Sequence, residues 1–89
     1  MLRITAIQVN GSSVTLKLEG KILAEWVPLL VRECEERLEK RERVVVDLSQ
    51  VTFIDQSGIQ MLQRASTLGV SIVNGSAFIA ELLDEGGKS

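Results

Sequence analysis

The sequence contains no histidine, only one cysteine and only three aromatic residues. Without histidine the chain lacks the commonest general base, and with a single cysteine, Cys34, it cannot form an internal disulfide. Both shortages argue against a zinc site. The chain has no apolar run of about 18 residues to span a membrane and no N-terminal run of signal-peptide length. We therefore expect a small cytoplasmic protein with no metal and no cofactor.

The charges are nearly balanced, with 10 basic and 12 acidic residues and a net charge of −2. The only basic cluster, in residues 37–43, is interleaved with glutamates, which is typical of a solvated helix face. Nucleic acid needs a concentrated basic surface, so it is not expected as a partner. The length of 89 residues and the 45% hydrophobic content predict one domain over residues 1–85. Residues 86–89 are expected to form a flexible C-terminal tail.

The stretch 44–68 organises the rest of the chain. Residues 44–48 are apolar except for Asp47, which predicts a central strand buried on both faces. Apolar residues between Ile59 and Leu68 recur at spacings of three and four, which predicts a helix packed on the sheet. The polar tip 55–58 lies between them. Partners of parallel sheets usually meet the carboxyl ends of the strands, so a functional site is expected at this tip.

Two strand patterns precede this stretch. Residues 14–19 alternate cleanly between apolar and polar side chains, and residues 2–9 alternate less regularly. Asn10-Gly11 between them tolerates the positive φ of a tight turn. The two segments are therefore predicted to pair as an antiparallel hairpin.

A helix is predicted from about Ala24 to about Arg41, with Pro28 near its first turn, where a missing N–H costs little. Cys34 falls on its apolar face and is expected to be a buried apolar residue instead of a reactive thiol. Trp26 lies off that face. It either covers the end of the core or anchors a partner, because tryptophan is common in both settings.

The C-terminal part predicts a strand over residues 70–73, a turn at Asn74-Gly75 and a last helix over residues 77–84. Ser76 is a suitable N-cap for that helix. The residues expected to dock on the sheet are Phe78, Ile79, Leu82 and Leu83. The resulting order, β-β-α-β-α-β-α with right-handed crossovers, predicts an α/β fold with a four-stranded mixed sheet and three helices.

Asp55 and Ser57 are the only residues that suggest chemistry. A nucleophilic serine needs a nearby base, and the segment has neither the glycines of a nucleophile elbow nor a phosphate-binding loop. An enzyme is therefore not expected. Ser57 and Gln60 match a capping box, which makes Ser57 the predicted N-cap of the second helix. The same serine is a plausible phosphorylation target, and a phosphate adds about −1.5 to −2 charges there.

The sequence Val-Val-Val-Asp-Leu-Ser-Gln-Val-Thr-Phe-Ile-Asp-Gln-Ser-Gly over residues 44–58 resembles the signature of the STAS domain, the fold of bacterial anti-sigma factor antagonists. Residues 18–22 and 72–76 are also similar to that family. The resemblance implies that Ser57 is phosphorylated by an anti-sigma factor that is itself a serine kinase, and that Asp55 orders the loop. The surface expected to bind this partner comprises Asp55, Gln56, Ser57, Gly58, Gln60, Gln63 and Arg64.

Family members commonly continue with a further strand and a final helix, whereas this sequence shows one short last helix. A homodimer contact or simply a smaller sheet would cover what that extra part covers. An alternative function follows from the same resemblance. The chain could be a structural STAS subunit of a lipid transporter or of a stressosome-like assembly, in which Ser57 only caps its helix.

Overall fold

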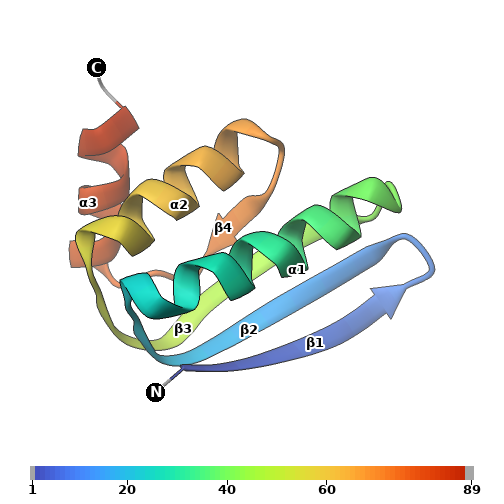
Figure 1. Ribbon diagram of the computed structural model, residues 1–89, viewed down its shortest axis with the longest axis horizontal. Helices are drawn as coiled ribbons and strands as arrows, with labels where there is room; N and C mark the ends of the chain where they lie inside the picture. Colours follow the sequence, from blue (N-terminus) through green and yellow to red (C-terminus); the bar gives the residue numbers. More distant parts are fainter. Residues whose placement is uncertain (1, 88–89) are drawn as a thin grey trace.

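The computed structural model describes the backbone of residues 2–87 and the side chains of residues 2–83. It contains a four-stranded sheet with helices α1 and α2 over one face (Figure 1). The predicted order of strands and helices is confirmed, with one added 3-10 turn, η1. The elements are β1 (Leu2–Asn10), β2 (Ser13–Ile22), η1 (Ala24–Trp26), α1 (Val27–Glu39), β3 (Arg43–Ile54), α2 (Gln56–Thr67), β4 (Ser71–Val73) and α3 (Ala77–Gly87). None of the described helices has the length and apolar character needed to cross a membrane.

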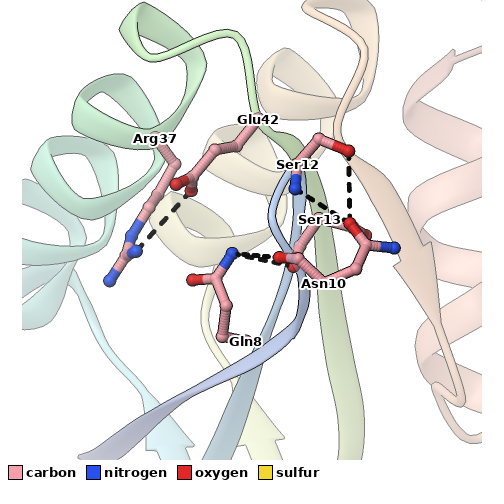
Figure 2. Close-up of polar contacts among 6 residues, drawn as sticks. All are labelled: Gln8, Asn10, Ser12, Ser13, Arg37 and Glu42. Carbon is pink, nitrogen blue, oxygen red and sulfur yellow. Dashed lines mark hydrogen bonds and ion pairs between the residues drawn. The ribbon is translucent and has the colours of Figure 1, made fainter.

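The sheet has the order β1-β2-β3-β4 and is mixed, as predicted. β1 pairs antiparallel with β2, while β2 with β3 and β3 with β4 are parallel pairs. At the hairpin turn, the Asn10 carboxamide oxygen accepts hydrogen bonds from the Ser12 backbone N–H at 2.8 Å and the Ser12 hydroxyl at 3.1 Å (Figure 2). Gln8 donates to the Asn10 carbonyl at 2.6 Å, so side chains of β1 close its own turn.

The prediction that the central strand is buried on both faces is wrong. Val44, Val46 and Leu48 are buried, but Val45 and Asp47 between them are partly exposed. Both α1 and α2 lie on the same side of the sheet, and neither covers the opposite face (Figure 1). β3 also runs to Ile54, six residues past the predicted end, with bulges in its pairing with β2. Residues 49–54 mix polar and apolar side chains without a regular alternation, so the sequence shows no strand pattern for the second half of β3.

The first predicted helix is confirmed in position but begins with the 3-10 turn and ends at Glu39. Arg41 adopts a left-handed conformation, φ 59°, and its N–H donates to the Leu38 carbonyl at 2.9 Å. This residue closes the helix in the way that a glycine usually does. Arg37 then pairs with Glu42 across the closure at 3.6 Å (Figure 2).

Cys34 and Trp26 both pack against the core. Cys34 is buried, as predicted, and burial raises the pKa of its thiol, helped by the nearby carboxylates Glu33 and Glu35. Trp26 is half-buried, which agrees with a side chain covering the end of the core. Its indole N–H is buried and has no hydrogen-bond partner among the described residues.

The last helix starts as predicted. The Ser76 hydroxyl accepts a hydrogen bond from the Ile79 N–H at 3.2 Å, so Ser76 is its N-cap. Ile79 is buried and Leu82 and Leu83 are half-buried, but Phe78 is 70% exposed, so its predicted docking on the sheet is wrong. Phe78 precedes Ile79 by about 100° around the helix, and Ile79 takes the position facing the core. α3 continues to Gly87, and residues 88–89 of the predicted tail lie outside the described part.

Candidate functional site

Asp55 joins the end of β3 to two helices. One carboxylate oxygen, Oδ1, accepts the Gly58 N–H at 2.9 Å and makes Asp55 the N-cap of α2. The other, Oδ2, accepts the Ala24 N–H at 2.7 Å at the start of η1. The Asp55 backbone N–H donates to the Ile22 carbonyl at 3.0 Å. One residue therefore holds the start of α2, the start of η1 and the end of β2 together.

The prediction that Ser57 is the N-cap of α2 is wrong. α2 begins at Gln56, so Ser57 is its second residue, and the predicted capping box with Gln60 does not form. Aspartate is as good an N-cap as serine, and Asp55 has a second oxygen free for the η1 donor. Ser57 is exposed, and its hydroxyl makes no hydrogen bond to any described residue. The hydroxyl is thus accessible to another molecule.

Gly58 sets how closely α2 approaches the sheet. It is buried, and a Cβ at this position would lie 2.8 Å from the Ile22 Cγ2 and 2.8 Å from the Ile54 Cγ1. Real Cβ atoms essentially never come so near other carbons, so a larger residue would force the helix away. The absence of a side chain at Gly58 therefore lets the start of α2, including Ser57, lie close to the sheet.

A hollow of about 390 Å³ lies between α1 and α2 next to the exposed serine. Ser57, Gln60 and Arg64 line one wall of it, because positions i, i+3 and i+7 share a face of a helix. The other lining residues are Val27, Val31 and Met61. Three of the predicted site residues are thus brought together over an apolar floor. Gln56 is exposed one residue before Ser57.

Gln63 is separate from these residues. Its side chain amide donates to the Leu83 carbonyl at 3.1 Å and lines a different hollow, of about 790 Å³, between α2 and α3. The structure therefore does not bring Gln63 together with Ser57, Gln60 and Arg64.

Sequence reasoning also missed three contributors to the site. It did not find the Ala24 N–H that Asp55 accepts. It also did not show that Val27 and Val31, which fall on the apolar face of the first predicted helix, line the hollow. Their four-residue spacing marked an apolar helix face but gave no sign that its edge would remain open.

The arrangement presents an exposed hydroxyl beside a hollow with polar and apolar walls. Both Asp55 oxygens accept backbone N–H groups, which hold this carboxylate at the starts of α2 and η1. Among the described residues, no group of three metal-ligating side chains is close enough to hold a metal ion. The amino end of α2 favours negative charge near Ser57, because its first N–H groups point outward.

Comparison with known proteins places the chain in a family. Residues 5–87 match the family model described as "Mlab, STAS domain". The chain therefore belongs to this STAS family, as its sequence signature indicated. No curated protein sequence matches it.

Solved structures share the fold at low sequence identity. An anti-sigma factor antagonist from Mycobacterium paratuberculosis superposes with a TM-score of 0.80 at 16% identity, covering 98% of this chain and 79% of that one. The STAS domain of an antisigma-factor antagonist from Rhodobacter sphaeroides gives a TM-score of 0.62 at 23% identity, with coverages of 82% and 86%. Unphosphorylated SpoIIAA, an anti-sigma factor antagonist, gives 0.73 at 14%, with 92% and 82%. The predicted STAS fold is confirmed.

Proposed function

We infer that this chain is a cytoplasmic, non-enzymatic partner-switching module of the anti-sigma factor antagonist type. In this proposal, its unphosphorylated form binds an anti-sigma factor with serine kinase activity. That kinase phosphorylates Ser57, and the added charge releases the complex. The observation that carries the proposal is the exposed Ser57 hydroxyl at the rim of the hollow between α1 and α2.

The surroundings of Ser57 support a switch that leaves the fold unchanged. Ser57 is not a cap and makes no hydrogen bond to a described residue, so modifying it breaks no contact within the chain. The N-terminal end of α2 tolerates a phosphate, because the helix dipole and outward N–H groups favour negative charge. The carboxylate of Asp55 is directed at two N–H donors, which offsets its repulsion of that phosphate.

The partner would meet a mixed surface. Val27, Val31 and Met61 offer apolar area, while Gln60 and Arg64 offer hydrogen-bond donors. A phosphate on Ser57 carries about −1.5 to −2 charges. A docked partner would bury this charge without a basic group to pair with it, which would weaken binding. The kinase machinery and its nucleotide would belong to the partner. One structural neighbour at 15% identity is SpoIIAA in its phosphorylated form, which supports the idea by analogy.

The experiment is a phosphorylation assay with an anti-sigma kinase from the same genome and ATP, read by mass spectrometric mapping. Phosphate is expected on Ser57 and absent from Ser57→Ala. Ser66→Ala is the matched control, because Ser66 is another exposed serine of α2 outside the hollow beside Ser57. Ser57→Asp should weaken kinase binding by about tenfold or more, which is about 1.4 kcal/mol. A label elsewhere, or unchanged binding of Ser57→Asp, would refute the switch.

A second candidate is favoured by the family model itself, whose description is "Mlab, STAS domain" and names no antagonist. In this alternative the chain is an unphosphorylated structural subunit of a larger complex, such as a lipid transporter or a stressosome-like assembly. Affinity purification of the chain at its native level separates the two. Stable recovery of a transporter ATPase or scaffold by wild type and Ser57→Ala alike, with no phosphate on Ser57, would support the structural role.

A further inference from the structure

The two edges of the sheet are very different. β4 forms one edge with three residues, whereas β1 forms the other with nine. β1 pairs only with β2, so its outer row of backbone N–H and C=O groups has no strand partner among the described residues. Such a row is a template for another strand, and proteins usually protect it.

β1 carries few of the usual protections. It contains no proline and no lysine, and Arg3 is its only charged residue. That charge is already paired with Glu19 of β2 at 3.7 Å. Two apolar side chains of the strand, Ile7 and Val9, are 47% and 61% exposed. A long edge strand of this composition is either an aggregation hazard or an interface.

The helix layer also leaves part of β1 uncovered. Ala6 lies directly opposite Leu16, and Gln8 opposite Val14, so each pair shares the face that the helices cover. Leu16 and Val14 are fully buried, but Ala6 and Gln8 are exposed. The helices therefore cover β2 and the start of β1, where Leu2 is buried, but leave the helix-side face of β1 open at Ala6 and Gln8.

We propose that β1 pairs antiparallel with β1 of a second copy, forming a two-fold dimer with one continuous eight-stranded sheet. Pairing β1 with β4 of another copy would give a ladder of only three residues, because β4 has no more. β3 also extends past its pairing with β4, over residues 48–54, but two register shifts interrupt that part of the strand. Among the described strands, β1 therefore offers the longest regular edge. Pairing of identical edges about a two-fold axis also closes the assembly, whereas β1–β4 pairing would continue into a filament.

The strand favours one register. Its pairing with β2 is regular from Leu2 to Gln8 and irregular between Gln8 and Asn10. The centre of the regular part is Thr5, so placing Thr5 opposite Thr5 of the second copy pairs every regular residue. Threonine pairs are favourable across antiparallel strands.

The same register suits the other side chains. Arg3 falls opposite Ile7 of the second copy, where its alkyl stem covers an exposed apolar side chain. Ile4, which is partly buried against the core, falls opposite the exposed Ala6 of the second copy on the helix side of the sheet. The only charge of the strand never opposes itself, so no like-charge repulsion arises between the two copies of β1. This self-complementarity argues for a second copy as the occupant of the edge.

This dimer is independent of the proposed switch. Ser57 lies at the start of α2 beyond β3, and β2 separates β3 from β1 (Figure 1). Ser57 of each copy therefore remains accessible in the dimer. Loss of dimer formation would leave the phosphorylation result untouched, and the reverse also holds.

Sedimentation velocity over a concentration series tests the association. The wild type is expected to reach twice the 9.8 kDa chain mass. Ile7→Lys places a lysine on the pairing edge and should weaken the dimer about tenfold or more. Val73→Lys is the matched control, since it puts the same charge at a partly exposed valine on the opposite edge and should leave the dimer intact. A wild-type monomer throughout, equal effects of both variants, or open-ended aggregation would overturn the proposal.

Disulfide trapping tests the register, in a Cys34→Ala background that removes the only native cysteine. Thr5→Cys should cross-link under mild oxidation, because directly opposite Cβ atoms lie about 4.5–5.5 Å apart, within small adjustment of a disulfide. Arg3→Cys, on the same face, should not. Its counterpart lies four residues along the strand, about 14 Å away. Equal cross-linking at both positions would refute the Thr5-centred pair.

Discussion

Replacing Asp55 by alanine tests the central feature of the site. The change removes the N-cap of α2, worth about 1 kcal/mol. It also removes the hydrogen bond from the Ala24 N–H, which is more exposed and worth about another 0.5–1.5 kcal/mol. The expected loss is about 2 kcal/mol of the free energy of unfolding. For a domain of this size, that loss lowers Tm by about 8–16 °C.

Urea unfolding followed by circular dichroism measures this loss. Asp55→Ser separates the energies of the two hydrogen bonds. Serine is a good N-cap, but its shorter side chain has a single oxygen, which cannot accept from the Ala24 N–H as well. It should cost about half as much as Asp55→Ala. Ser57→Ala is the matched control and should stay within about 0.5 kcal/mol of wild type, since its exposed hydroxyl caps nothing.

The reverse pattern would refute the assignment of the cap. If Ser57→Ala costs about 1 kcal/mol while Asp55→Ala costs less than that, Ser57 caps α2 and the start of the helix is misplaced. If Asp55→Ser and Asp55→Ala cost the same, the N-cap of α2 contributes nothing to the free energy of unfolding. If Asp55→Ser costs nothing, the hydrogen bond from the Ala24 N–H contributes nothing.

Three further predictions concern packing and pH. Gly58→Ala should lose about 1–2 kcal/mol in urea unfolding, because overpacking outweighs the better helix propensity of alanine, whereas Gly11→Ala, with open space around it, should change little. Burial raises the pKa of Cys34 in the folded chain, so stability should fall as the pH rises above 9.0, and Cys34→Ala should remove that decline. The hydrogen bond from the Ser49 N–H lowers the pKa of the Asp47 carboxyl in the folded chain. The stability that the ionised carboxyl contributes should therefore be lost as the pH falls below 3.8. Asp47→Asn should make this loss smaller in acid unfolding.

Local patterns predicted most of the fold. The clean alternation of residues 14–19 and the turn at Asn10-Gly11 predicted the hairpin, and the structure confirms the pairing, although neither turn residue has the positive φ expected there. Ser76 was correctly predicted as the N-cap of α3. In each case the decisive interactions join residues close in the sequence, so propensity and spacing contain the needed information.

Features that depend on distant residues were not predictable. The Ala24 N–H that Asp55 accepts lies 31 residues earlier in the chain, and it exists only once β2 and β3 are parallel neighbours. The cap itself was missed although it is local, because the Ser57–Gln60 pattern predicted Ser57 as the cap, whereas the Gly58 N–H donates to Asp55, three residues earlier. The one-sided burial of β3 was missed because it also depends on distant residues. Val45 is apolar, but whether a helix covers it depends on where the crossovers place α1 and α2.

Adjacent residues after the end of β3 have different structural roles. Asp55 is committed to two backbone donors and Gly58 to close packing against β2 and β3, so changing either would move the helix. Ser57 does not cap the helix and has no such structural role. A switch needs a residue whose charge can change without unfolding its own support, and in this segment the neighbours of Ser57 provide that support. The proposed switch therefore requires Asp55 and Ser57 variants to fail differently. Asp55 variants should lose stability first, while Ser57 variants should lose partner control in a fully folded chain.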